Sequence, residues 1–352
     1  MTNSTLTEDF KSEVYTDKSN LKSLDIFENT NLFKAEKATR SKTEKLIKND
    51  IKGWLFSCWP FVGYCIFALV PFALSLYLSM CDLHVFNLWS ARWVGFDNYI
   101  YLLFSSESQF WWSLFQTVYF CASLPIGIAM GIGSAMLLTS RIKMKRLFRT
   151  ILYIPSVCSS VGVVMMWQII FDTNHGLINS IITSLGGERV MWFTNPDLFM
   201  PLVIITSTWG AGNSSIMFQA AFTNINKSLV EAASIDGAGK WAIFKNVTLP
   251  AISPTTFYTL TMSIIAAFQA MGEVQLFSQA GNVSGYGPKY ATGPFKGMYA
   301  GMTTTYYIYM MGFGGGSEGQ GKSSAAAWLL ALVIIALTRI NFKLGDLWVN
   351  YD

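Results

Sequence analysis

The chain has 352 residues, of which 52% are hydrophobic and 13% are charged, and its mean hydropathy is +0.36. A typical soluble domain carries about 25% charged residues, so this composition excludes a protein whose main solvent is water. The net charge of +4 comes without a basic patch interleaved with aromatics outside the apolar segments, so no nucleic-acid partner is expected. We therefore expect an all-α integral membrane protein that crosses the cell membrane several times.

The chain begins with a polar tail, residues 1–53, which is poor in aromatic side chains. Such a composition favours a disordered segment. The first apolar stretch lies far from the N-terminus and is too long for the core of a signal peptide. We expect it to remain as the first transmembrane helix, over residues 54–80.

Six apolar segments are long enough, or nearly so, to cross a bilayer as helices, which takes about 20 apolar residues. The last of them is the shortest and has the least certain ends. The five that follow the first helix would form a permease core over residues 110–342. The six segments are 54–80, 112–138, 151–171, 200–222, 257–277 and 323–340.

The positive charges indicate how these segments are oriented. If the N-terminus is cytoplasmic, 20 of the 25 Lys and Arg residues fall in the tail and on the inner side of the spans. Basic residues concentrate on the cytoplasmic side of membrane proteins. Both termini are therefore predicted to be cytoplasmic, together with the loop 226–250 between the fourth and fifth segments.

That cytoplasmic loop contains the run Glu231-Ala-Ala-Ser-Ile-Asp236-Gly237-Ala-Gly239. The pattern predicts two short helices, 229–235 and 240–247, joined by a tight turn that uses the conformational freedom of Gly237 and Gly239. Asp236 is expected to cap the second helix by accepting N–H bonds. The result would be an exposed helix-turn-helix.

Other residues of this loop have expected roles as well. Glu231 would anchor the loop through a salt bridge or a helix cap. Ala232 and Ala233 would permit close approach of a partner, although both could simply favour the helix. Leu249 and Pro250 would fix the exit of the loop into the next span.

The run from Glu231 to Gly239, with Val247-Thr-Leu249-Pro250 after it, resembles the EAA loop of binding-protein-dependent ATP-driven importers. From about residue 54 onward, the chain is similar to the first membrane subunit of carbohydrate ABC importers of the maltose and glycerol-phosphate type. The segments that carry this wider resemblance are Val94-Gly-Phe-Asp-Asn-Tyr99, Leu147-Phe-Arg-Thr-Ile-Leu-Tyr-Ile-Pro155, Trp192-Phe-Thr-Asn-Pro-Asp197, Trp209-Gly210 and Ala267-Phe268-Gln269.

The resemblance implies a type I ABC importer permease fold and a subunit that forms half of a path for a sugar or oligosaccharide. The implied partners are a second homologous permease, a cytoplasmic ATPase dimer gripped through the EAA loop, and an extracellular solute-binding protein. The chain itself would be no enzyme and would bind no cofactor, because ATP and Mg would belong to the ATPase. The polar tail and the glycine-rich stretch 312–322 depart from the family pattern.

Polar groups near the middle of the spans are candidates for the substrate path. Gln269 falls near the midplane of the fifth segment, and Ala266 would let a sugar ring approach. The family alignment adds Gly210 and Asn213, which could instead serve helix packing. Glu273 is the acidic residue that lies well inside a span, and it could bond a solute at the rim or face water.

Catalytic and metal-binding residues are not predicted, because the five cysteines and two histidines show no suitable spacing. The string from Gly316 to Ser323 matches the phosphate-loop pattern, but it precedes a membrane span instead of following a strand. The alternative function is an ion-coupled secondary transporter, for which Glu273 is the single intramembrane carboxylate and no internal repeat is evident.

Overall fold

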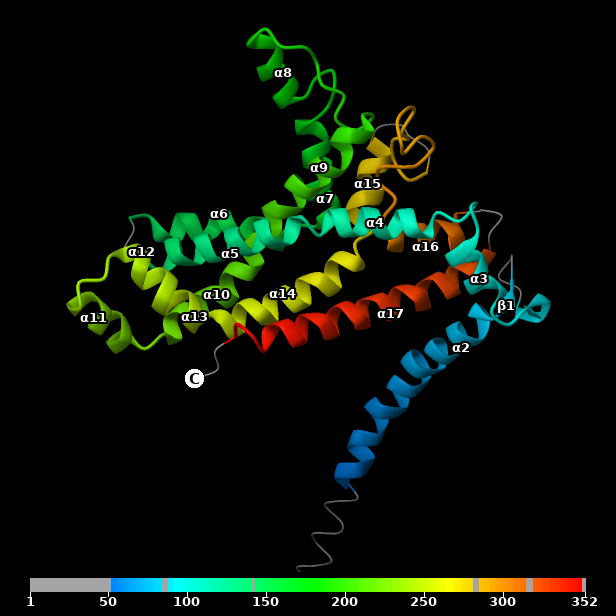
Figure 1. Cartoon of the computed structure of the whole chain (residues 1–352), viewed down its shortest axis with the longest axis horizontal. Coiled ribbons are helices and arrows are strands. Elements are labelled where there is room, and N and C mark those ends of the chain that lie inside the picture. Colours follow the sequence, from blue (N-terminus) through cyan, green and yellow to red (C-terminus); the bar gives the residue numbers. More distant parts are fainter. Residues whose placement is uncertain (1–51, 84–87, 141–142, 281–284, 315–318, 350–352) are drawn as a thin grey trace, which may run out of the picture. The chain divides into compact units, whose positions relative to one another are not determined.

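The computed structural model describes residues 52–83, 88–140, 143–280, 285–314 and 319–349, without the side chains of Leu88 and residues 211–213. The chain divides into two compact units, residues 1–74 and 75–352. Figure 1 shows the helices along the chain. The predicted tail falls almost wholly outside the described residues.

The described part of the first unit is helical, and its helix continues into the second unit. Together they form a helix from Lys52 to Ser79, which is 28 residues long and apolar enough to cross a membrane. It contains a π-helical turn at Cys65–Leu69, followed by α2 (Val70–Ser79). This helix occupies the segment predicted as the first span.

The second unit opens with a small antiparallel ribbon, in which β1 (Cys81–Asp82) pairs with β2 (Arg92–Trp93). The side chain of Asn98 donates hydrogen bonds to the carbonyls of Ser79 and Cys81, at 2.9 Å each. Asn98 thereby provides hydrogen-bond donors for backbone carbonyls at the end of the first helix. This contact explains why the segment 94–99 carries an amide side chain at position 98.

The rest of the second unit is helical. Its α-helices are, in chain order, α3 (Asp97–Phe104), α4 (Phe110–Phe120), α5 (Ser123–Thr139), α6 (Lys145–Val157), α7 (Ser160–Ile170), α8 (Leu177–Ser184), α9 (Pro196–Thr208), α10 (Gly212–Asn224), α11 (Lys227–Ile235), α12 (Lys240–Ile243), α13 (Leu249–Ala251), α14 (Ser253–Phe268), α15 (Gly272–Ala280), α16 (Thr304–Phe313) and α17 (Gly319–Gly345). Short 3₁₀ and π turns join some of them, at Leu88–Ser90, Trp209–Ala211 and Phe244–Thr248.

Three of the predicted spans are broken rather than continuous. The third bends by 104° between α6 and α7, and the fourth is interrupted by the 3₁₀ turn at Trp209–Ala211. In the fifth span, α14 ends at Phe268 and α15 begins at Gly272. A further bend of 64° separates the end of the loop 226–250 from α14.

The last span is longer than predicted. Instead of residues 323–340, α17 covers the 27 residues from Gly319 to Gly345. Hydropathy missed its first turn because Gly319, Gly321 and Ser323 are buried against protein and need no apolar side chain.

By length and composition, three described helices can cross a membrane, or up to five if each bent pair counts as one span. The three are Lys52–Ser79, Phe110–Thr139 and Gly319–Gly345. The shorter apolar helix Pro196–Thr208 begins the predicted fourth span. The count of six spans, with both termini in the cytoplasm, stays a prediction.

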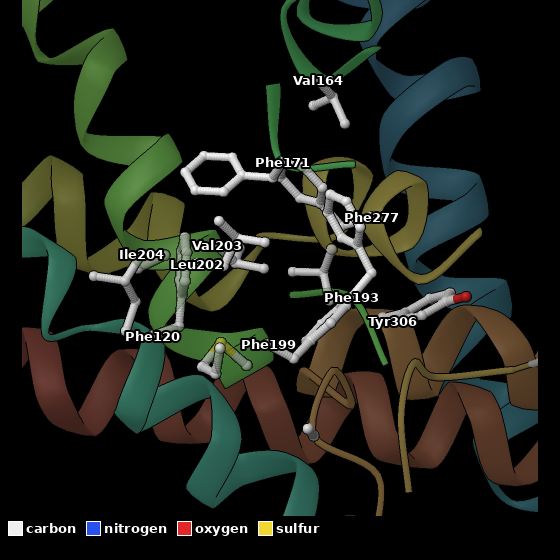
Figure 2. Packing of buried hydrophobic residues seen from close by; sticks show 14 residues of the cluster. Phe120, Val164, Phe171, Phe193, Phe199, Leu202, Val203, Ile204, Phe277 and Tyr306 are labelled. Carbon is white, nitrogen blue, oxygen red and sulfur yellow. The ribbon is translucent and has the colours of Figure 1, made fainter. Parts of the chain in front are cut away.

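The main apolar core joins helices that are far apart in the sequence. Figure 2 shows Phe199 and Val203 of α9 among Phe120 of α4, Phe277 of α15 and Tyr306 of α16. In Figure 1, α14 and α17 run side by side, as do α5 and α10. This packing holds the ends of α4, α9 and α15 around one central space.

Candidate functional site

A cavity of about 850 Å³ lies within the second unit, between α4, α5, α7, α9, the 3₁₀ turn at Trp209–Ala211, α10, α14 and α15. Four residues predicted for the substrate path line it together, although they come from two distant segments: Gly210, Ala266, Gln269 and Glu273. Asn213 belongs to α10, but its side chain lies outside the described part of the structure. The volume is within the usual range for sites that bind small molecules.

The cavity also has a set of hydroxyl groups that sequence reasoning missed. They come from five helices or turns, and each is a Ser or Thr inside a predicted span: Ser123, Ser160, Ser207, Thr208, Ser214, Thr259 and Ser263. The sequence signal that could have identified them is a hydroxyl side chain within an apolar segment. The spacing of these residues, however, does not indicate which of them face the cavity. Among the described lining residues, Phe120 is the one aromatic side chain.

The break in the fifth span places Gln269 and Glu273 at the cavity. Because α14 ends at Phe268, the carbonyls around the break lack regular helical partners. The hydroxyl of Thr305 donates to the Phe268 carbonyl at 2.8 Å, and that of Thr303 donates to the Ala270 carbonyl at 2.9 Å. Irregular backbone inside a membrane is tolerated when protein groups satisfy it in this way.

The intervening threonine binds a different helix. Thr304 donates its backbone N–H to the hydroxyl of Thr117 on α4 at 2.8 Å, and the two hydroxyls lie 2.9 Å apart. Three successive threonines therefore join the start of α16 to the break in the fifth span and to α4.

Replacing Thr305 by valine is expected to destabilise the permease by about 1–2 kcal/mol, because the partly buried Phe268 carbonyl would lose its donor. The measurement is the free energy of unfolding in detergent. The control is Thr223→Val, because the Thr223 hydroxyl bonds only within its own helix, to the Gln219 carbonyl. An equal loss in both variants would contradict this role of Thr305.

The loop 226–250 has the predicted helix-turn-helix, formed by α11 and α12. The first helix ends in a Schellman motif, in which Gly237 donates its N–H to the Ser234 carbonyl at 3.2 Å and Ala238 donates to the Ala233 carbonyl at 3.0 Å. Gly237 has a φ of +81°, as the turn requires. The turn thus explains the glycine at position 237.

Two details of the loop differ from the expectation. Gly239 has a φ of −67°, so it needs no glycine-specific conformation, and it stands directly before α12 as its N-cap. Asp236 does not cap α12, because it lies at the C-terminal end of α11, and no side chain caps α12. Glu231 is exposed and lines a small pocket of about 320 Å³ beside Lys227, at the base of the loop.

The tip of the loop exposes large apolar side chains. Ile235 is 85% exposed and Trp241 is 73% exposed, and the Trp241 ring stacks on Phe244 with the ring centroids 5.5 Å apart. The α13 helix, which contains Leu249 and Pro250, follows and leads into α14. Exposed apolar groups on a segment outside the predicted spans are typical of a protein-binding surface.

The described end of the phosphate-loop-like string forms the start of α17. The N–H groups of Gln320 and Gly321 donate to the Leu83 carbonyl, and the Lys322 ammonium lies 3.7 Å from the centroid of the Tyr101 ring. These donors serve packing instead of a phosphate. In the part of the chain that the structure describes, no three His, Cys, Asp or Glu residues are grouped to hold a metal ion.

Broken apolar helices thus surround a cavity lined by hydroxyl, amide and apolar groups, and an exposed helix-turn-helix follows α10 in the chain. Residues 123–344 match the family model of the binding-protein-dependent transport system inner membrane component. The chain belongs to this family of ABC transporter permeases, which are multi-pass transport subunits of the plasma membrane and not enzymes. The alternative of an ion-coupled secondary transporter is therefore not retained.

Relatives match along nearly their whole length. The probable ABC transporter permease protein YesP of Bacillus subtilis is 31% identical, over 88% of this chain and 96% of the relative. The lactose transport system permease protein LacF of Rhizobium radiobacter is 29% identical, over 87% and 97%. The sn-glycerol-3-phosphate transport system permease protein UgpA of Yersinia pestis is 32% identical, over 82% and 91%.

Solved structures confirm the fold. One is a crystal structure of a bacterial ABC transporter involved in the import of the acidic polysaccharide alginate, with a TM-score of 0.66 and 24% identity over 86% of this chain and 98% of the other. Another is the bacterial alginate transporter in complex with an alginate pentasaccharide-bound periplasmic protein, with a TM-score of 0.68 and 24% identity over 84% and 94%. The type I importer permease fold predicted from the sequence is therefore confirmed.

Proposed function

We propose that this chain is one of the two permease subunits of an ABC importer for a sugar or oligosaccharide. The observation that carries the proposal is the cavity, because Gly210, Ala266, Gln269 and Glu273 converge on it from separate helices. A cavity lined by hydroxyl and amide groups suits a solute rich in hydroxyls. The relatives named for lactose and sn-glycerol-3-phosphate support this class of cargo.

The loop 226–250 is the proposed contact with the ATPase. Its exposed Ile235 and Trp241 offer an apolar surface, and the Schellman turn holds α11 and α12 in a fixed relation. ATP-driven closure of the ATPase dimer would move this loop and with it α10 and α14, which flank it in the chain. ATP can favour one conformation only through a difference in its binding free energy between the two states.

The proposed assembly also contains a second permease, which completes the path, and a solute-binding protein at the outer face. ATP and Mg would be bound by the ATPase alone. The structural neighbour solved with a periplasmic protein supports such an arrangement. The topology that fits it has both termini in the cytoplasm, on the side of the loop 226–250.

Purification in mild detergent from the membranes of the native host tests this proposal. We expect mass spectrometry to find one second permease and two ATPase copies per tagged chain. If the chain purifies alone from a detergent in which a known ABC importer stays assembled, the proposal is wrong.

Replacing Gln269 by leucine is expected to weaken the response to solute about five- to tenfold, the effect of losing about one hydrogen bond. Gln269 is exposed to the cavity at the break between α14 and α15. The measurement is the dependence of ATPase activity on the concentration of the loaded binding protein, together with uptake in vesicles. The subunit stoichiometry must stay as in the wild type, and unchanged stimulation and uptake would remove Gln269 from the path.

A further inference from the structure

A single charged side chain, that of Glu273, lies among the described residues that line the cavity. Of its described lining residues, Glu273 carries a carboxylate, and none is a lysine, an arginine or a histidine. Glu273 is exposed to the cavity at the start of α15. Within the described chain, no ion pair neutralises this carboxylate.

The neutral groups of the cavity add to this asymmetry. The hydroxyls of Ser207, Thr208 and Thr259 each donate to a backbone carbonyl of their own helix, at 2.7–2.8 Å. Their protons are therefore used, whereas their oxygen lone pairs remain available. Toward a solute, these three groups act mainly as hydrogen-bond acceptors.

A carboxylate and acceptor hydroxyls treat solutes of different charge differently. They can accept hydrogen bonds from the hydroxyls of a neutral sugar or from an ammonium group. A uronate or a sugar phosphate would bring a second negative charge to the same narrow space, where low-dielectric walls strengthen repulsion. Such repulsion is a common means of excluding the wrong ligand.

We infer that Glu273 is a specificity-determining residue that makes this cavity select neutral or amine-bearing saccharides against anionic ones. The inference rests on the proposed function, in which the solute passes through this cavity. By this inference, the solute of this chain differs in charge from an acidic polysaccharide or a phosphate ester. Relatives and structural neighbours with such names nevertheless share its fold.

The test measures the charge preference of the cavity without knowledge of the natural solute. Ser263, which lines the cavity from α14, is replaced by cysteine in the full transporter complex. The new thiol is labelled with a cationic reagent, trimethylammonium-ethyl methanethiosulfonate, or an anionic one, sulfonato-ethyl methanethiosulfonate. Mass spectrometry of the peptide around residue 263 gives both rates, so the native cysteines can remain in place.

The reference is Ser184→Cys, at an exposed position on α8 that belongs neither to the cavity lining nor to the loop 226–250. Relative to this reference, we expect the ratio of cationic to anionic labelling at residue 263 to be about tenfold higher. Glu273→Gln should bring the ratio to within about twofold of the reference, and Glu273→Lys should invert it. Neither change should alter the ratio at residue 184.

A ratio at residue 263 that does not respond to Glu273→Gln would overturn the inference, and so would a preference for the anionic reagent in the unchanged cavity. Failure of the proposed function has a different signature. In that case the chain purifies without an ATPase and shows no ATP-driven uptake, whatever the labelling ratio is.

Discussion

Replacing Gly237 by proline is expected to abolish coupled uptake while leaving the protein inserted in the membrane. The φ of Gly237 is +81°, whereas proline fixes φ near −65°. Proline also removes the N–H that Gly237 donates to the Ser234 carbonyl. A cost of about 3 kcal/mol would shift the loop about a hundredfold away from its docking conformation.

The measurements are ATP-driven uptake in vesicles and the amount of ATPase that copurifies with the chain. Gly239→Ala is the matched control, because Gly239 has an ordinary φ of −67° and open space around the position of a Cβ atom. It should retain most of the uptake. Glu231→Ala should weaken ATPase attachment, and full uptake in both Gly237→Pro and Glu231→Ala would contradict the proposed coupling role.

Replacing Gly321 by alanine is expected to cost about 3 kcal/mol of stability, because overpacking against fixed backbone cannot be relieved by a side-chain rotation. A Cβ atom at this position would collide with the backbone carbonyl of Cys81 and lie 3.2 Å from the Asn98 amide nitrogen. The start of α17 would have to move away from β1. The measurement is the unfolding free energy in detergent, together with the yield of folded chain from membranes.

Gly133→Ala serves as the control, because a Cβ atom there meets nothing within 4 Å and alanine favours the helix. It should be neutral or slightly stabilising. If Gly321→Ala unfolds like the wild type, the close contact between α17 and β1 is not part of the folded state.

The helix-turn-helix of the loop 226–250 could be predicted well because its signals are local. Gly237 and the small residues before it define a turn by themselves, and the structure has that turn at the expected place. The errors concern its second half. Asp236 and Gly239 are both common at helix N-termini, and the sequence does not show that α12 starts only after Gly239.

The spans could be located by hydropathy, but their breaks could not. The residues that flank the 104° bend, 151–157 of α6 and 160–170 of α7, are mostly apolar, so a sliding average over them does not register the bend. The break after Phe268 depends on Thr303 and Thr305, which lie more than thirty residues away in the sequence. Such a long-range contact has no local signal.

The cavity was predicted in part. Gln269 and Glu273 are polar residues in an apolar segment. Exposing their side chains to lipid would be costly, which predicts that both face the interior of the protein. Serine and threonine give a weaker signal, because their hydroxyls can bond to their own helix and face either way. Thr259 illustrates this point: its hydroxyl donates to the Thr255 carbonyl, and the residue still lines the cavity.

The alternating threonines at the start of α16 fix the alignment of this segment residue by residue. Thr303 and Thr305 face the fifth span, and Thr304 faces α4. A shift of α16 by a single position would place either Met302 and Thr304 or Thr304 and Tyr306 at the broken backbone, and would remove Thr303 and Thr305 from their present carbonyls. These hydrogen bonds fix the start of α16 to the wall of the cavity, so we expect α16, Gln269 and Glu273 to move together in any conformational change of the protein.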